Sequence, residues 1–339
     1  MCGICGVIAK TKIDRDDILN MTRTLKHRGP DNINIEVFDN LGLGHARLSV
    51  IDLSSSANQP MSNEDDSIWL VYNGENYTFR EYRKVLLNKG HKFKSNTDSE
   101  VILHLYEEYG MDFVSCLRGM FAIAILDLRK DKLILLRDRV GIKPLFYYHD
   151  GSKFLFASEI KAIMQYPGII RNMDLESLRT YFSLGYIPGE NSIYDKIKKL
   201  PPAHVLTFHE HNVEIKRYWS LPEIIIFKDE NSAREELESL LLESVKMQMI
   251  SDVPLGVLLS GGLDSSLVAS IMASKSDRPI KTFSISFNEE EYNEIEHARN
   301  VARHIQSEHF EYKVDLEKSE IIEDLVYYYD EPFADSSAI

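Results

Sequence analysis

The first nine residues constrain the fold of this chain more than any other segment. Residues 3–9 form an apolar run with two glycines, which is typical of a buried β-strand. A strand that begins at the third residue ties the N-terminus into the fold, so Cys2 is expected at a fixed position. The residue before it, Met1, can be removed by an aminopeptidase because cysteine is small.

Without Met1, Cys2 carries a thiol and a free α-amino group on the same residue. The α-amine titrates near pH 8 (about 7.7–8.0) and can accept the thiol proton directly or through a water molecule. An incidental small residue is the alternative interpretation of Cys2 taken alone. The strand that follows favours a catalytic nucleophile.

The composition limits the classes of function. A length of 339 residues predicts two domains, and 39 lysines and arginines against 53 acids give a net charge of −14. This charge argues against nucleic acid as a partner, and no apolar run approaches the roughly 18 residues of a membrane span. Three cysteines are too few for a disulfide framework or a zinc site. We therefore expect a cytoplasmic protein with no membrane partner.

Residues 1–210 are expected to form the first domain. Helical spacing of apolar side chains predicts helices near residues 79–86 and 102–109. Separate strands and helices predict an α+β fold. The strands are expected at residues 33–38, 41–48, 68–72, 120–126, 133–137, 145–149 and 153–157.

Residues 211–339 are expected to form a second domain, after a connection marked by Pro201-Pro202 and residues 218–229. Strands at 256–259, 280–286 and 310–314 alternate with helices at 264–273 and 294–305, after a first helix near 233–249. This alternation predicts a parallel sheet with crossover connections.

Motifs spread over nearly the whole chain resemble two protein families. Those of the first domain resemble class II glutamine amidotransferases, whose N-terminal cysteine hydrolyses glutamine. They are MCGICG at 1–6, HRGPD at 27–31, HARLS at 45–49, YNGE at 72–75, SNTDSE at 95–100 and RDRVGIKPL at 137–145. LSGGLDSS at 259–266 is similar to the pyrophosphate loop of AMP-forming synthetases. Together they resemble glutamine-hydrolysing asparagine synthetases.

The resemblance implies a fold for each domain. The first is an N-terminal-nucleophile (αββα) glutaminase domain, in which two antiparallel sheets pack face to face between helical layers. The second is an α/β pyrophosphate-loop synthetase domain. A later glycine-rich motif of that family is absent, so we interpret the chain as an N-terminal fragment with an incomplete second domain.

The resemblance also implies a glutaminase site around the catalytic Cys2. Asn73 and Gly74, expected in a tight turn after a strand, would donate hydrogen bonds to the tetrahedral oxyanion. A hairpin turn is the alternative interpretation of this Asn-Gly pair. Arg47 would grip the α-carboxylate of glutamine.

Asp98 would bind the α-ammonium group of glutamine, and it could also cap the helix that follows. Val50, Ile51 and Glu75 would complete the glutamine pocket, together with Asn73 and Gly74. One departure from the family pattern is Asn76, which stands where an apolar residue is usual and could loosen the packing.

The serine- and glycine-rich loop predicts an anion site, since backbone N–H groups and a helix N-terminus converge there. It is not a Walker A motif, which favours release of pyrophosphate over transfer of the γ-phosphate. Asp264 is expected to act through Mg²⁺. By resemblance, ATP would contact Leu259, Ser260, Gly261, Gly262, Asp264, Ser265, Ser266 and Ile285. A glycine turn with a capping aspartate is the alternative.

The leading hypothesis is an ATP-dependent ligase, a glutamine-hydrolysing asparagine synthase. It would convert aspartate, glutamine, ATP and water to asparagine, glutamate, AMP and pyrophosphate through a Cys2 thioester, internal ammonia and an acyl-adenylate. ATP is a substrate here, Mg²⁺ assists, no organic cofactor is expected, and a homodimer is possible. Alternatives are amidation of another carboxylate (a surface sugar or a β-lactam precursor), a stand-alone glutaminase, or a non-enzymatic nucleotide-binding module.

Overall fold

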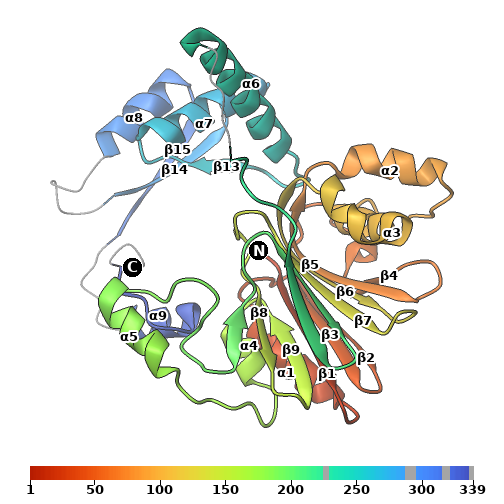
Figure 1. Cartoon of the computed structure of the whole chain (residues 1–339). Coiled ribbons are helices and arrows are strands. Elements are labelled where there is room, and N and C mark those ends of the chain that lie inside the picture. Colours follow the sequence, from red (N-terminus) through yellow and green to blue (C-terminus); the bar gives the residue numbers. More distant parts are fainter. Residues whose placement is uncertain (224–228, 287–294, 315–320, 336–339) are drawn as a thin grey trace. The chain divides into compact units, whose positions relative to one another are not determined.

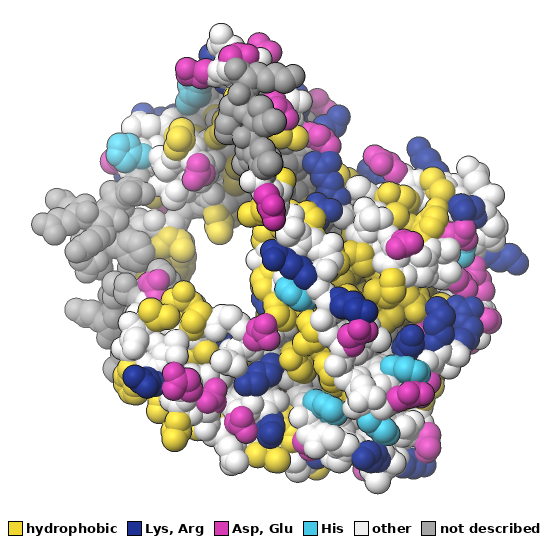
Figure 2. Space-filling view, viewed as in Figure 1, with side chains coloured by type: hydrophobic (Ala, Val, Ile, Leu, Met, Phe, Trp, Pro, Cys, Tyr) yellow, Lys and Arg dark blue, Asp and Glu magenta, His cyan; other side chains and the backbone are white. Residues whose placement is uncertain are grey.

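The computed structural model describes residues 1–223, 229–286, 295–314 and 321–335 (Figure 1). It divides into two compact units, one of Met1–Leu221 with Ile322–Ile339 and one of Pro222–Ile321. Within these described ranges, no helix is long and apolar enough to cross a membrane. Basic and acidic side chains are interspersed over the surface seen in Figure 2.

A six-stranded antiparallel sheet holds the N-terminus of the first unit. Its central strand β1 pairs with β9 on one side and β3 on the other, in the order β10-β8-β9-β1-β3-β2 among the described strands. Because β1 is hydrogen-bonded on both sides, the sheet fixes the position of Cys2 just before it. The strands are β1 (Gly3–Ala9), β2 (Asn32–Phe38), β3 (Leu41–Arg47), β8 (Phe146–His149), β9 (Lys153–Ala157) and β10 (Ile197–Lys199).

A second six-stranded antiparallel sheet lies against the first. Its described strands run in the order β12-β11-β7-β6-β5-β4. They are β4 (Met61–Ser62), β5 (Ile68–Asn76), β6 (Gly119–Asp127), β7 (Lys132–Arg137), β11 (His204–His209) and β12 (Asn212–Arg217). One apolar cluster draws on both sheets and fills the space between them, with Ile4 and Leu43 facing Val71 and Leu135.

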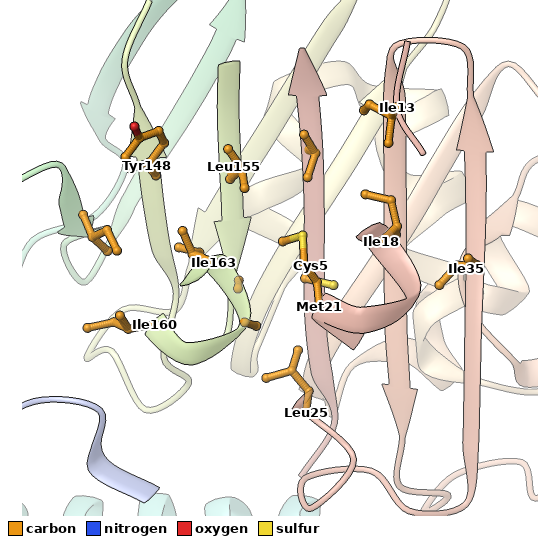
Figure 3. Packing of buried hydrophobic residues seen from close by; sticks show 14 of the residues in the cluster. Cys5, Ile13, Ile18, Met21, Leu25, Ile35, Tyr148, Leu155, Ile160 and Ile163 are labelled. Carbon is orange, nitrogen blue, oxygen red and sulfur yellow. The ribbon is translucent and has the colours of Figure 1, made fainter. Parts of the chain in front are cut away.

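Helices cover the two outer faces. Helices α1 (Arg15–Thr24) and α4 (Ile160–Met164) bury a second apolar cluster against the first sheet, where Ile18 and Met21 of α1 approach Cys5 of β1 (Figure 3). Helices α2 (Phe79–Asn88) and α3 (Asp98–Tyr109) pack beside the second sheet. The order helix, sheet, sheet, helix confirms the predicted αββα arrangement.

Two local predictions were wrong. Asn73 and Gly74 do not form a turn: they lie within β5, opposite Ala122 and Phe121 of β6. The N-cap of α3 is Thr97, whose side chain accepts a hydrogen bond from the Ser99 N–H, whereas Asp98 is the first helical residue.

The first unit also extends further than the strand pattern indicated. The hairpin of β11 and β12 completes the second sheet through pairing of β11 with β7. Strand β12 was missed because its residues are mostly polar and half or fully exposed, so they lack the apolar alternation of a core strand. Short 3₁₀ helices occur at Ser55–Ala57 and Gly110–Cys116.

Two further helices belong to the periphery of the first unit, α5 (Leu175–Leu184) and most of α9 (Ile321–Tyr329). The residues after α9 are anchored by ion pairs. Asp330 Oδ1 lies 3.1 Å from Lys161 Nζ, and Glu331 Oε1 lies 2.5 Å from Lys199 Nζ. The end of the described chain is therefore attached to the unit that contains the N-terminus.

The second unit contains the predicted parallel sheet. Strand β14 (Lys281–Ser286) lies between β13 (Gly256–Leu258) and β15 (Glu308–Lys313), and both pairings are parallel. Helices α6 (Glu230–Gln248), α7 (Leu263–Lys275) and α8 (Ile295–His304) enclose one apolar core. The predicted parallel α/β topology is confirmed.

Candidate active site

Cys2 is held between the start of β1 and the end of β3. Its Sγ accepts a hydrogen bond from the Leu48 N–H at 3.4 Å and lies 3.6 Å from the Leu48 carbonyl oxygen. Two residues later, Ile4 donates its N–H to Ser158 Oγ at 3.0 Å and accepts from the Ser158 N–H at 2.9 Å. The thiol is therefore placed by the backbone on both sides.

The HRGPD motif positions Cys2. Arg28 Nε donates to the Cys2 carbonyl oxygen at 3.0 Å, and Arg28 Nη1 donates to Glu159 Oε1 at 2.7 Å. His27 Nε2 lies 3.0 Å from the same Glu159 oxygen. Since Glu159 is buried and shared by His27, Arg28 and Lys161, it fixes the guanidinium that orients the Cys2 peptide.

Gly29 and Asp31 of the same motif shape the loop after β3. A side chain at Gly29 would lie 2.2 Å from the Ala46 carbonyl oxygen, so only glycine fits there. Asp31 Oδ2 accepts from the Ser49 N–H at 2.7 Å. The loop whose Leu48 N–H bonds Cys2 is therefore held both by β3 and by the HRGPD motif.

The protonation of Cys2 depends on its surroundings. Burial raises the pKa of the Cys2 thiol, and the hydrogen bond from Leu48 lowers it in part. In this structure Met1 precedes Cys2, so the nitrogen of Cys2 belongs to a peptide bond. The other buried cysteine, Cys5, bonds Thr22 at 3.4 Å, and burial raises its pKa to about 12. Of this pair, only Cys2 lines the pocket described below.

Asn73 offers a donor for an oxyanion. Its Nδ2 is buried, and among the described residues it has no hydrogen-bond partner. Val71, two positions earlier on the same face of β5, belongs to the core between the sheets, so the Asn73 amide also points into that space. Strands β1 and β5 lie against each other there.

The N–H of Gly74 is a second donor. Successive N–H groups of a strand point to opposite sides, and those of Tyr72 and Asn76 leave β5 on the side away from β6. They donate to Gln59 Oε1 at 2.6 Å and to Asp98 Oδ2 at 2.8 Å. Gly74 lies between them and lines the pocket, so its N–H points to the same side.

Arg47 ends β3 and is nearly fully buried. Its Nη1 donates to the Ser54 carbonyl oxygen at 2.7 Å and to Asn58 Oδ1 at 2.8 Å, and its Nη2 donates to the Asp52 carbonyl oxygen. These bonds use three of the five N–H groups of a guanidinium. The remaining two can bind a carboxylate in the pocket that Arg47 lines.

Two carboxylates share the opposite part of the pocket. Asp98 Oδ2 accepts from the Tyr72 hydroxyl at 2.9 Å in addition to the Asn76 N–H. Burial raises the pKa of Asp98, and burial together with the charge of Asp98 raises the pKa of Glu75 to about 8. Two close acids, one of them near Lys143, are suited to an ammonium ligand.

Lys143 is a buried base that the sequence analysis did not single out, although it lies in the RDRVGIKPL motif. Burial lowers the pKa of Lys143, and the nearby charge of Glu75 raises it in part. Its positive charge faces both Glu75 and Cys2. It therefore moderates the negative charge of this pocket.

One pocket brings these groups together. Its volume is about 340 Å³, including the open mouth. Of the predicted glutaminase residues, all but Asn73 line it; Gln59, Tyr72, Thr97 and Ser99 are additional. The predicted residues in the lining are Cys2, Arg47, Val50, Ile51, Gly74, Glu75 and Asp98.

Asn76 does not leave a gap beside the site. Its Oδ1 accepts from the Arg118 N–H at 3.2 Å and from Thr78 Oγ1 at 2.9 Å. The side chain is fully buried, and its Nδ2 has no partner among the described residues. The expected loosening is therefore offset by hydrogen bonds that hold the turn after β5.

The predicted nucleotide loop follows β13 and leads into α7. Gly261 has φ +85°, and a side chain on it would lie 2.5 Å from the Ala298 nitrogen of α8. Ser260 Oγ accepts from the Gly262 N–H at 3.3 Å and lies 2.9 Å from Ser265 Oγ. This compact turn at a helix N-terminus is suited to an anion.

The other predicted nucleotide contacts differ in accessibility. Leu259 is buried in the core of the second unit, so only its backbone could meet a nucleotide. The side chain of Ile285 is 58% exposed. Ser266 Oγ donates to the Gly262 carbonyl oxygen at 2.7 Å, and Asp264 is exposed in the first turn of α7. A single carboxylate fits Mg²⁺ where phosphate oxygens supply further ligands.

Comparison with known proteins identifies both halves of the chain. The glutamine amidotransferase domain family matches residues 1–219, and the asparagine synthase family matches residues 236–339. A putative glutamine-hydrolysing asparagine synthetase of Methanocaldococcus jannaschii is 38% identical over 99% of this chain and 70% of its own length.

Further relatives occur in Bacillus subtilis. Its asparagine synthetases 3 and 1 are 39% and 34% identical over 85% and 100% of this chain, and the alignments span 48% and 54% of their lengths. The solved structure of Bacillus subtilis glutamine phosphoribosylpyrophosphate amidotransferase is 15% identical, with a TM-score of 0.49 over 91% of this chain and 65% of that chain.

The fold assignment rests on the two antiparallel sheets between helices, and the family assignment rests on the matches in sequence. The chain spans from about half to 70% of the length of these relatives. By these matches, the chain belongs to the family of glutamine-hydrolysing asparagine synthetases.

Proposed function

We propose that the first unit hydrolyses glutamine at the pocket around Cys2. The observation that carries this proposal is the convergence of a placed thiol, a buried guanidinium and two acids on one pocket. The α-carboxylate of glutamine would bind the free N–H groups of Arg47. Its α-ammonium would bind Asp98 and Glu75, which directs the side-chain amide towards Cys2.

The chemical step uses donors that have no other partner. The Cys2 thiolate attacks the amide carbon, and the oxyanion accepts hydrogen bonds from Asn73 Nδ2 and the Gly74 N–H. Ammonia leaves after proton transfer, and water then hydrolyses the γ-glutamyl thioester to glutamate. Removal of Met1 would provide the α-amine of Cys2 as the base.

The second unit would use the ammonia. We propose ATP as a substrate at the loop of residues 259–266, with Mg²⁺ held between Asp264 and the phosphates. Aspartate is the acceptor that the family implies, activated as an acyl-adenylate, with AMP, pyrophosphate and asparagine as products of the whole protein. A cytoplasmic homodimer without an organic cofactor, a nucleic-acid partner or a membrane partner belongs to the same proposal.

Substitution of the nucleophile tests the glutaminase proposal. Cys2→Ala is expected to abolish glutamine hydrolysis, because no other group near the pocket can form the thioester. Cys116→Ala is the matched control, since this half-buried cysteine lies outside the pocket lining. Glutamate release is measured, and circular dichroism checks the fold. A Cys2→Ala variant with a tenth of the wild-type rate would exclude the thiol as nucleophile.

A product assay tests the acceptor. The full chain receives glutamine, ATP and either aspartate or another carboxylate, and AMP is measured. AMP formed only with aspartate supports asparagine synthesis, whereas AMP formed with a different carboxylate identifies another acceptor. Hydrolysis of glutamine without any AMP restricts the activity of this chain to glutaminase chemistry.

A further inference from the structure

We propose that two histidines and two glutamates outside the glutamine pocket form a binding site for a divalent transition metal, with Zn²⁺ as the probe ion. The four residues are Glu64 after β4, His91 after α2, and His104 and Glu107 on α3. One ligand atom from each lies within 4.8 Å of every other. We call this group the α3 cluster.

The spacing of the α3 cluster suits tetrahedral coordination. His104 Nδ1 lies 3.3 Å from Glu107 Oε2 and 3.6 Å from Glu64 Oε2. His91 Nδ1 lies 3.6 Å from the same Glu107 oxygen and 3.9 Å from Glu64 Oε1. Metal–ligand bonds of about 2.0–2.1 Å place tetrahedral ligand atoms about 3.3 Å apart. A cation therefore requires only small side-chain movements.

Each imidazole also has a carboxylate on its other nitrogen. His91 Nε2 lies 3.3 Å from Glu108 Oε2, and His104 Nε2 lies 3.9 Å from Glu100 Oε1. Histidine ligands commonly direct their second N–H at a carboxylate, which fixes the tautomer and strengthens the ligand. His104 Nε2 has no hydrogen-bond partner among the described residues, so only His91 makes this second contact at hydrogen-bond distance.

The glutamates are oriented towards the imidazoles. Asn63 Nδ2 donates to Glu107 Oε1 at 2.9 Å, which leaves Oε2 facing both histidines. The Lys92 N–H donates to Glu64 Oε1 at 2.9 Å. These bonds come from neighbouring loops, so the two carboxylates hold their positions without depending on each other.

The charges in this region favour a bound cation. Glu64, Glu100, Glu107 and Glu108 lie within 4 Å of the two imidazoles. Lys89 pairs with Glu108 at 2.5 Å, and Arg129 lies 3.9 Å from Glu107. Two bases against four acids leave negative charge that a divalent cation would neutralise.

The inferred site is structural. Four protein ligands would close a tetrahedral shell and leave no position for a substrate. His104 and Glu107 lie on the helix whose first residue, Asp98, reaches the glutamine pocket. A cation there would fix α3 relative to the loops at Glu64 and His91, and so stabilise the helix that carries Asp98.

Zinc titration of the full, untagged chain tests the inference. Cys2→Ala serves as the background throughout, because a free thiol also binds zinc. Glu64→Gln and His91→Gln remove one ligand each without emptying the core, since both side chains reach the surface. His211→Gln, an exposed histidine in the β11–β12 hairpin, is the matched control.

The expected result is one Zn²⁺ per chain by competition with a chromogenic chelator. Each ligand variant is expected to bind at least tenfold more weakly, and the control is expected to bind as its background does. Zn²⁺ should raise the melting temperature of the background but not that of the two ligand variants. Equal affinity in all four proteins, or no stoichiometric binding to the background, would overturn the proposed site.

Discussion

Asn73 carries a buried amide that suits the proposed oxyanion site. Burying an amide without a partner costs about 1–3 kcal/mol, and both Asn73 and Asn76 of β5 bear this cost among the described residues. Nδ2 of Asn73 is such a group, and the N–H of the next residue, Gly74, points into the pocket. A ligand oxygen that develops negative charge would satisfy both.

Asn73→Ala is therefore expected to lower kcat for glutamine hydrolysis by about 10²–10³, the cost of one oxyanion donor. KM should change little, because the amide would act on the transition state and not on the bound substrate. Steady-state kinetics measure both. Asn76→Ala is the control: it removes a buried amide from the same strand and should affect stability more than kcat. Equal losses of kcat in the two variants would contradict the assignment of Asn73.

The folding stability of the chain depends on pH through Glu75. Its pKa is raised to about 8 in the folded chain from 4.5, first by burial and then by Asp98. A raised folded pKa favours the protonated form, so its contribution to stability is complete below about pH 4.5 and is lost as the pH rises through 8. The ligand-free protein should thus lose stability between these values.

Glu75→Gln is expected to remove this loss, because it replaces the ionisable group with a neutral one. At pH 8 the variant should be more stable than the parent by about 1–3 kcal/mol, since one pKa unit corresponds to about 1.4 kcal/mol. It should also bind glutamine more weakly. Urea unfolding at pH 6 and pH 8 measures the difference, with exposed Glu81→Gln as the control. A Glu75→Gln variant that gains nothing at pH 8 would show that the carboxylate is compensated in the free protein.

At the scale of elements, the sequence predicted most strands with apolar patterns, but it missed β11, which has one, and β12, which lacks one. The predicted strand at 68–72 continues to Asn76, because pairing with β6 maintains an extended chain through polar residues and a glycine. The local preference of Asn73-Gly74 for a turn indicated that the strand would end before these residues. Pairing of β5 with β6 outweighed this turn preference. A pattern of five neighbouring residues cannot show such pairing.

The site was predictable in residue type but not in geometry. The motifs identified Arg47 and Asp98, yet nothing in them showed that three N–H groups of Arg47 are already used. Lys143 lies in a motif that was recognised, but its charge near Cys2 depends on long-range packing. In the α3 cluster, only His104 and Glu107 are spaced in the sequence as metal ligands on one helix would be.

The segment after α9 illustrates an element held by charge. Lys161 bonds Asp330 through both its Nζ and its backbone N–H, the latter at 3.0 Å. The Ala334 N–H donates to the Gly185 carbonyl oxygen at 2.8 Å. Burial raises the pKa of both Asp330 and Glu331, and their lysine partners lower it in part. These buried pairs fix the segment more firmly than surface pairs would.

Asp330→Ala is expected to release this segment, because Lys161 would lose one partner and keep Glu159 at 2.5 Å. Limited proteolysis around residues 321–335 should become at least about tenfold faster, as a loss of 1.4 kcal/mol predicts when local opening precedes cleavage. Glu323→Ala, an exposed position on α9, is the control. Unchanged cleavage in Asp330→Ala would mean that the apolar contacts of α9 hold the segment without this pair.

At the scale of the whole molecule, the two units differ in how completely their cores are covered. The first has apolar clusters on both faces of its first sheet. In the second, one face of the parallel sheet presents large apolar side chains to solvent within the described residues. They are Leu258, Phe283, Ile285, Phe310 and Tyr312. An exposed surface of this kind promotes association.

A fragment of Met1–Leu221 should therefore separate glutamine hydrolysis from self-association. It contains every residue placed in the glutamine pocket and both sheets with their helices, so it is expected to fold and to keep most of the kcat for glutamine hydrolysis. It should remain monodisperse at concentrations where the 339-residue chain self-associates, because it lacks the exposed sheet of the second unit. Glutamate release and light scattering measure the two properties.

A soluble fragment with no hydrolysis would show that residues beyond 221 complete the glutaminase site. Equal self-association of fragment and full chain would place the association surface in the first unit.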